Sequence, residues 1–132
     1  EGPVWIDEAL WFTDIKKRKV HRFDPANGDR RSWDAPAQVG FVLPARTGGF
    51  VAGLQSGLHR FDPASGGFIP LAEVEPDRPG NRLNDGTVDP SGRLWFGSMD
   101  DGEAAKSGSF YRFDKSGLVS TGLSGIAITN GP

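Results

Sequence analysis

Short apolar runs recur along the chain at nearly constant intervals. Three of them, at residues 10–14, 50–54 and 94–98, read alike and begin 40 and 44 residues apart. A second run follows each of them, at residues 21–25, 59–63 and 111–115, and leads to a glycine at Gly28, Gly66 or Gly117. The runs are rich in Val, Phe and Trp and are bounded by Asp-Pro, Ser-Gly, Asn-Gly and Gly-Gly pairs. This pattern predicts β-strands joined by tight turns.

A period of roughly 40–50 residues is typical of a solenoid or a propeller. No stretch has helical periodicity strong enough to favour a helix over these strands, so the helical repeat classes fit poorly. Several strands in a unit of this length match a propeller blade, which is a four-stranded antiparallel sheet. The sequence therefore predicts an all-β fold with about three blades, at approximately residues 1–40, 41–84 and 85–132 of one partial β-propeller.

Three blades are fewer than a closed propeller needs. An unclosed set of blades would expose one apolar blade face at each end, which is unfavourable in water. We therefore expect the chain to be part of a longer polypeptide, or to pair with another copy or chain.

Composition narrows the function classes. The 19 Gly and 10 Pro residues argue against a helical bundle. With 15 basic and 17 acidic residues, the net charge of −2 offers no electrostatic basis for binding nucleic acid or an anionic membrane. No apolar run approaches the roughly 18 residues of a membrane span. No cysteine and no signal-peptide pattern occur in the sequence, so we expect a cytoplasmic location.

Several repeated polar and aromatic residues have structural explanations. The acidic residues of the turns are expected to bond nearby backbone N–H groups: Asp24, Asp62, Asp89 and Asp114. The tryptophans are expected to pack between blades: Trp5, Trp11, Trp33 and Trp95. His21 and His59 occupy equivalent repeat positions and are interpreted as packing residues rather than metal ligands.

One position of the repeat carries polar groups. Counting nine residues back from each apolar run gives Glu1, Phe41 and Asp85, with Asn84 beside Asp85, and the segment at Asn130 matches the one at Glu1. Equivalent positions of a propeller lie on a ring around its axis, and residues just before the innermost strand lie at the channel mouth. Carboxylate and amide oxygens suit hard cations such as Ca²⁺, Mg²⁺ or Mn²⁺. Spacing alone is explained by turn formation, and a metal site is the alternative interpretation.

Arg82 lies two residues before Asn84. Its guanidinium near a metal would hold an anionic or polyhydroxylated ligand by paired hydrogen bonds, and a surface loop arginine is the alternative. Asp100, Asp101 and Glu103 follow the third apolar run in a polar loop. They are interpreted either as lid residues over the channel or as solvated charges.

Three motifs together resemble a known family: Glu1-Gly2-Pro3-Val4-Trp5, residues 81–89 with Arg82 and Asn84, and Asn130-Gly131-Pro132. They are similar to the regucalcin (senescence marker protein)–gluconolactonase family, in the same order along the whole chain. The resemblance implies a six-bladed β-propeller, of which this chain is the N-terminal half, that hydrolyses sugar lactones. It also implies one divalent cation (Ca, Zn, Mg, Mn or Fe) in the central channel. Within the family the chain is most similar to bacterial sugar-acid lactonases such as xylonolactonase.

The resemblance also assigns roles to residues. It implies that Glu1 and Asn130 bind the metal and that Arg82 and Asn84 bind the substrate. The family's substrate-contacting Glu aligns near Gly102, so Glu103 would take its place after a shift of one residue. The family's remaining acidic ligand, which also serves as base, would lie beyond residue 132. The catalytic residue is therefore not in this chain, and the fragment alone is expected to be inactive.

Two other functions stay open. One is a non-catalytic propeller that binds calcium, a ligand or a protein, because fold alone does not fix function. The other is a homodimer in which two half-propellers close one ring. A binding platform has no need of Glu1, Asn84 and Asn130 in one register, which favours the lactonase. The expected partners are a small sugar lactone and the remaining half of the propeller, with no nucleic acid or membrane.

Overall fold

The computed structural model describes residues 1–132 and contains twelve β-strands and no helix. The first sheet contains β1 (Val4–Ile6), β2 (Ala9–Asp14), β3 (Lys19–Phe23) and β4 (Arg30–Asp34). The second contains β5 (Val39–Pro44), β6 (Phe50–Leu54), β7 (Gly57–Asp62) and β8 (Gly67–Glu73). The third contains β9 (Asn81–Val88), β10 (Leu94–Asp100), β11 (Gly108–Asp114) and β12 (Gly117–Ile126). The chain therefore offers no helix of the length and apolarity that a bilayer span requires.

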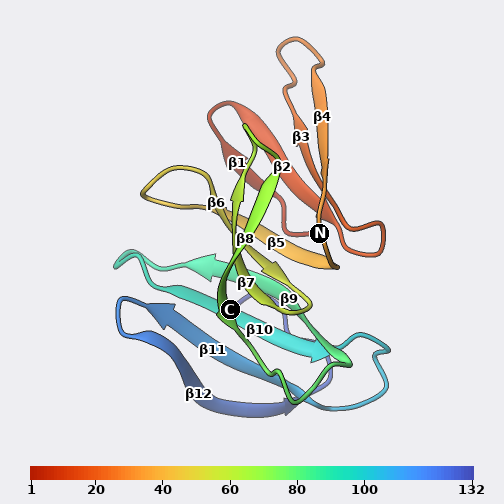
Figure 1. Cartoon of the computed structure of the whole chain (residues 1–132), viewed down its shortest axis with the longest axis vertical. Coiled ribbons are helices and arrows are strands. Elements are labelled where there is room, and N and C mark those ends of the chain that lie inside the picture. The colour runs from red at the N-terminus through yellow and green to blue at the C-terminus, as the bar shows by residue number, and fades with distance from the viewer.

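Each sheet is a four-stranded antiparallel meander in which consecutive strands pair. The three sheets follow one another along the long axis of the molecule in sequence order (Figure 1). A four-stranded meander for each repeat is the propeller blade, so the predicted all-β propeller class is confirmed. β5 and β9 begin at Val39 and Asn81, slightly ahead of the blade starts suggested by the repeat.

The apolar runs that reveal the repeat are the second strands of the sheets, β2, β6 and β10. A first strand precedes each of them, and β1 has only three residues. Glu1 lies just before its first strand, as expected. The same expectation is wrong for Phe41, Asn84 and Asp85, which lie within β5 and β9. Those two strands extend farther toward their N-terminal ends than β1 does, so the counted position falls inside them.

The acidic turn residues have the predicted structural role. Asp24, Asp62, Asp89 and Asp114 each accept a hydrogen bond from the backbone N–H two residues later, at 2.8–3.0 Å. These contacts satisfy N–H groups that the turns leave unpaired. The turns between strands are therefore specified by local sequence.

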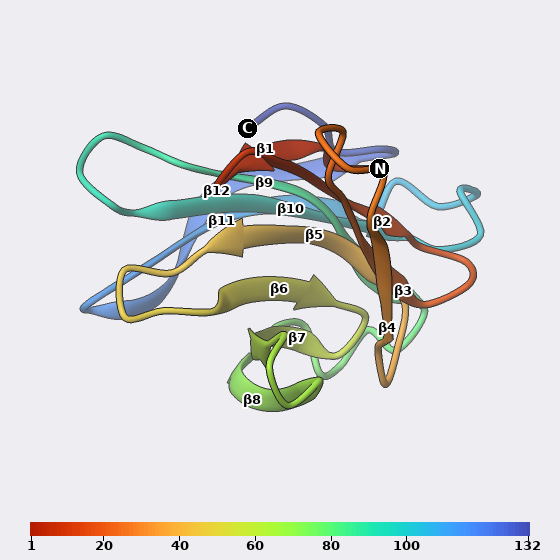
Figure 2. The same ribbon diagram turned by 90° about the horizontal axis from the view of Figure 1, so that it is seen from above.

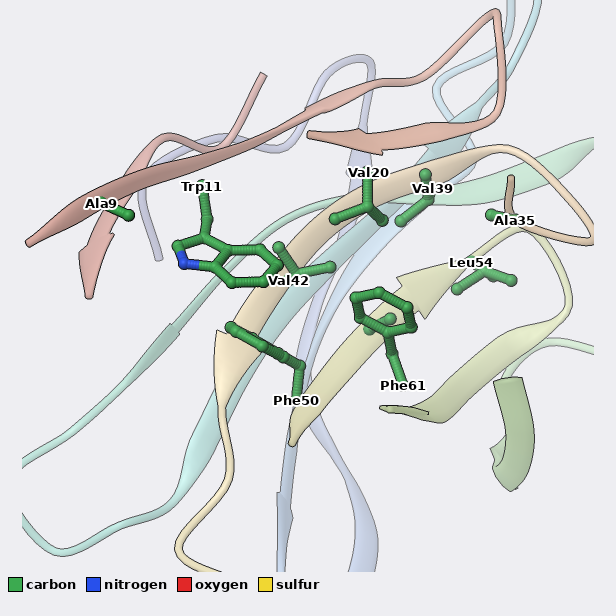
Figure 3. Close-up of a cluster of buried hydrophobic side chains, with 10 residues drawn as sticks. Ala9, Trp11, Val20, Ala35, Val39, Val42, Phe50, Leu54 and Phe61 are labelled. Carbon is green, nitrogen blue, oxygen red and sulfur yellow. The ribbon is translucent and has the colours of Figure 1, made fainter. Parts of the chain in front are cut away.

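Two hydrophobic cores lie between the sheets. The core between the first and second sheets contains ten buried residues, among them Trp11, Val42, Phe50 and Phe61 (Figure 3). The core between the second and third sheets includes Phe41, Leu58, Leu83, Leu94 and Phe96. The second sheet supplies side chains to both cores because successive strand residues point to opposite faces.

The tryptophans behave differently from one another. Trp11 and Trp33 stack with ring centroids 5.3 Å apart and belong to the packing between the first two sheets, as predicted. The expectation is wrong for Trp5 within this chain, since its side chain is 60% exposed. Trp95 donates its indole N–H to Asp89 of its own sheet at 2.9 Å.

Phe41 occupies a tight slot between the second and third sheets. Its ring is 1% exposed and lies 6.2 Å from the ring of Phe96, centroid to centroid. A Cβ at Gly53 would overlap the Phe41 ring, and one at Gly86 would lie 3.0 Å from it. The absence of a side chain at Gly53 and Gly86 therefore makes room for Phe41.

This packing predicts that Gly53→Ala is destabilising. The added methyl group forces the Phe41 ring out of its slot, and overpacking of this kind costs about 1–3 kcal/mol of unfolding free energy. Urea unfolding of the protein measures the change. Gly80→Ala is the control, because its Cβ would meet only Asp100, at 3.8 Å. An unfolding free energy that is equal in the two variants would contradict the packing argument.

Candidate functional site

Glu1 is held against the first sheet by its backbone. Its N–H donates to Thr13 O at 2.8 Å, and its carbonyl accepts from the Thr13 N–H at 3.0 Å. The Thr13 hydroxyl donates in turn to Gly40 O at 3.1 Å. Thr13 is 2% exposed, so this link between β2 and β5 lies inside the molecule. The backbone of Glu1 is therefore fixed, while its carboxylate remains exposed.

The segment that follows β12 lies beside β9. Asn84 is 7% exposed, and its side-chain amide donates to Thr129 O at 2.6 Å and to Asn130 Oδ1 at 3.1 Å. Asp85 Oδ2 accepts the Gly131 N–H at 2.8 Å. These contacts join residues that are 45 and 46 positions apart in the sequence. The two ends of the chain lie on the same side of the molecule (Figure 2).

Arg82 connects this pair to the acidic loop after β10. Its side chain is 5% exposed. The guanidinium donates from Nη1 to Asn84 Oδ1 at 2.7 Å and from Nε to Asp101 Oδ1 at 2.9 Å. Arg82, Asn84 and Asn130 therefore form one hydrogen-bonded chain, in which each amide has a defined orientation.

Asp101 is the residue whose role sequence reasoning missed, because it was interpreted only as a lid residue or a solvated charge. Its carboxylate accepts from Lys16 Nζ at 2.6 Å and from Gln38 Nε2 at 2.9 Å, in addition to Arg82. Burial raises the pKa of Asp101, but hydrogen bonds from Lys16, Gln38 and Arg82 outweigh it and lower the pKa from 3.8 to about 2. The only sequence signal for this contact is an acidic residue directly after the third apolar run, in a chain with a candidate ligand-binding arginine at Arg82.

Two cavities adjoin this polar cluster. One, of about 470 Å³, is lined by residues that include Glu1, Lys16, Arg82 and Glu103. The other, of about 390 Å³, is lined by Glu1, Asp85 and neighbours from β5 and β9. Glu1 lines both cavities. Asn84 and Asn130 line neither of them and are linked to Arg82 by hydrogen bonds. A larger cavity of about 550 Å³ lies against the first sheet and contains none of the predicted site residues.

The donor set partly suits a metal ion. The Glu1 carboxylate and the Asn130 side-chain oxygen are hard ligands of the kind that divalent cations such as Ca²⁺ and Mg²⁺ prefer. No three His, Cys, Asp or Glu side chains come together as a metal site anywhere in the chain. Glu1 lines both cavities and Asn130 lines neither, so a joint metal role for the two residues stays a prediction.

Three antiparallel four-stranded sheets in succession define a β-propeller chain. The chain belongs to the SMP-30/gluconolactonase/LRE-like family, whose sequence profile matches residues 1–132. The regucalcin–gluconolactonase resemblance of the sequence is thereby confirmed.

Individual relatives make the similarity specific. A 6-deoxy-6-sulfogluconolactonase of Pseudomonas putida is 30% identical over 133 residues, which cover 99% of this chain and 46% of that protein. An L-arabinolactonase of Azospirillum brasilense is 37% identical over 119 residues, 86% of this chain and 39% of that protein. The crystal structure of a calcium-binding protein, regucalcin, from Agrobacterium tumefaciens superposes with a TM-score of 0.90 at 30% identity, covering 97% of this chain and 44% of that one. The chain thus spans less than half the length of these relatives.

The lowered pKa of Asp101 predicts how stability depends on pH. A carboxyl group whose pKa falls on folding stabilises the native state above its unfolded pKa, and this contribution is lost as the pH falls through the folded value. The difference in unfolding free energy between the wild type and Asp101→Asn is therefore expected to be largest above pH 3.8 and to shrink toward pH 2. Urea unfolding of both proteins across this range measures it.

Asp34→Asn is the matched control for this titration. Asp34 also pairs with a lysine at 2.6 Å, but its side chain is 84% exposed. Exposed ion pairs contribute about 0–1 kcal/mol, so only a small change in stability is expected. A difference between wild type and Asp101→Asn that stayed constant down to pH 2 would contradict the prediction.

Proposed function

We propose that the protein containing this chain is a metal-dependent lactonase that hydrolyses sugar lactones, converting an aldonolactone to an aldonic acid at the central channel of a six-bladed propeller. The observation that carries the proposal is the hydrogen-bonded chain of Arg82, Asn84 and Asn130, next to a cavity that Glu1 and Glu103 also line. Membership of a family with lactonases among its relatives supports the reaction class.

In this proposal Glu1 and Asn130 bind one divalent cation, with Ca, Zn, Mg, Mn and Fe as candidates. When bound, the cation polarises the lactone carbonyl and activates water for attack. Asn84 orients Asn130, because its amide donates to Asn130 Oδ1 and so fixes which end of that side chain is the oxygen. The acidic ligand and base implied by the family resemblance lie outside residues 1–132.

Arg82 is proposed to bind the sugar. Its Nε and Nη1 are occupied within the protein, whereas Nη2 has no hydrogen-bond partner in the chain. Both N–H groups of Nη2 are therefore available to a ring oxygen or hydroxyl of a ligand in the cavity that Arg82 lines. Asn84 is proposed to contact the same substrate through Oδ1 only, because both of its N–H groups donate within the chain. The exposed carboxylate of Glu103 would accept hydrogen bonds from the hydroxyl groups of the sugar.

The remaining blades of the ring are proposed to come from the same polypeptide. The relatives support this, since this chain spans 46% of the Pseudomonas lactonase and 44% of the Agrobacterium protein. A second copy of the chain is the alternative source. A cytoplasmic location is also proposed, and a sequence without cysteine is compatible with a reducing compartment.

A second candidate function is calcium binding without catalysis. It is favoured by the similarity, at 30% identity, to a structure described as a calcium-binding regucalcin. The two functions share Glu1 and Asn130 but differ in their need for Arg82 and Glu103. Binding of Ca²⁺ by the complete protein without hydrolysis of any aldonolactone would favour the second candidate.

The lactonase proposal predicts that Glu1→Gln in the complete polypeptide abolishes metal-dependent hydrolysis. The amide loses the negative charge that binds the cation, so turnover is expected to fall by at least about 100-fold, as losses of metal-site residues commonly do. Acid release from gluconolactone and xylonolactone, measured after chelation and re-addition of each divalent metal, reports the activity. Calorimetry with the same metals is expected to show weaker binding.

Glu8→Gln is the matched control for Glu1→Gln. Glu8 is an exposed acid in the β1–β2 turn, and it lines neither cavity of the site. Its substitution is expected to leave both turnover and metal affinity unchanged. Undiminished turnover in Glu1→Gln would exclude Glu1 as a metal ligand.

A further inference from the structure

Arg82 is a buried cation that needs a fixed partner. Only 5% of its side chain is exposed, and a guanidinium in such a place is costly unless it is paired and hydrogen-bonded. Asp101 is the only carboxylate within salt-bridge distance of it, through Nε at 2.9 Å. The orientation of Arg82 therefore depends directly on Asp101.

Asp101 in turn joins three sheets. Lys16 comes from the turn between β2 and β3 of the first sheet, Gln38 precedes β5 of the second, and Arg82 lies in β9 of the third. Lys16 and Arg82 share Oδ1, whereas Gln38 uses Oδ2. Because its two oxygens receive donors from three sheets, the Asp101 carboxylate has little freedom to rotate.

The contacts of the guanidinium hold it in one plane. Asp101 accepts from Nε at one edge, and Asn84 accepts from Nη1 at another. A planar group bound at two of its three nitrogens has a defined direction for the third. Nη2 is the nitrogen left without a partner, and Arg82 lines the cavity shared with Glu1 and Glu103.

We propose that Asp101 is a positioning residue that orients the Arg82 guanidinium so that Nη2 faces the sugar. The proposal rests on the function proposed above, in which Arg82 binds the substrate. It assigns to the loop after β10 the task of fixing a donor rather than of covering the channel. A donor held in place before binding needs less ordering when the substrate arrives, which improves affinity.

Proton transfer is a poorer role for this carboxylate. The pKa of Asp101 is lowered to about 2, so the group is ionised throughout the neutral range. A general base works best when its pKa lies near the operating pH. Asp101 therefore acts through Arg82 and not on the lactone.

The test is a double-mutant cycle on lactone hydrolysis by the complete, metal-loaded protein. Asp101→Ala is expected to raise KM for the lactone about tenfold while kcat changes less, because the oriented donor contributes to binding. In the Arg82→Ala background the same substitution is expected to have no further effect. If the two substitutions instead multiply, Asp101 acts independently of Arg82 and the proposal is wrong.

Two further variants keep the cycle interpretable. The asparagine of Asp101→Asn has the shape of the aspartate it replaces. The unpaired Gln38 Oε1 can accept from the new amide once the Gln38 side-chain amide rotates by a half turn. This variant retains the hydrogen bonds but loses the charge, so a smaller rise in KM is expected. Asp34→Asn, which removes an exposed carboxylate, is expected to leave KM unchanged. An unchanged KM in both Asp101 variants would overturn the proposal.

A second readout does not depend on catalysis. The Nε–H signal of Arg82, assigned in nitrogen-15 NMR spectra by its loss in Arg82→Lys, is expected to exchange slowly with solvent in the wild type. The signal is expected to exchange fast in Asp101→Ala and to stay slow in Asp34→Asn. An unchanged signal in Asp101→Ala would show that Asp101 does not hold Arg82. If the wild type hydrolyses no lactone, the proposed function fails while this measurement still decides the positioning role.

Discussion

The fold of this chain depends on burying apolar side chains between successive sheets. The second sheet shows the constraint best, since Phe50 and Leu54 point toward the first sheet, while Phe41 and Leu58 point toward the third. Burying a large apolar side chain stabilises the fold by about 1.5–3 kcal/mol, so a sheet with two apolar faces is stable only between two neighbours. Face-to-face packing of successive blades is therefore the condition on which the polar site depends.

This packing brings the first strands close enough for backbone and side-chain contacts between sheets. Gly40 in β5 lies against the carbonyl oxygens of Leu83 and Asn84 in β9, where a Cβ would not fit. Thr13 of β2 bonds Gly40 from the other side. Polar groups that enter such an interior must find partners there, because an unpaired buried group costs about 1–3 kcal/mol. The network of Arg82, Asn84 and Asp101 meets this requirement and leaves Nη2 of Arg82 without a partner in the chain.

Sequence periodicity was sufficient to predict the all-β propeller class and the turns, but not the first strand of each sheet or the full site. The acidic turns were predictable because each one bonds a backbone group two residues away. The first strand of each sheet was harder to recognise, since β1 has only three residues and β9 is interrupted by polar residues. Arg82 and Asn84 could be selected from their spacing and from family resemblance. The metal role of Glu1 and Asn130 stays a prediction, because no three His, Cys, Asp or Glu side chains come together as a metal site in the chain.

The amino-acid sequence by itself determined the repeat, the strand pattern and the turn chemistry, because those features depend on residues a few positions apart. Only the tertiary structure decided which polar side chains meet. Lys16 and Asp101 are 85 residues apart, and Gln38 and Asp101 are 63 apart, yet all three converge beside Arg82. Such contacts depend on the length and path of each loop in the packed arrangement of the three sheets. The carboxylate that orients the arginine was therefore recognisable only in the folded chain.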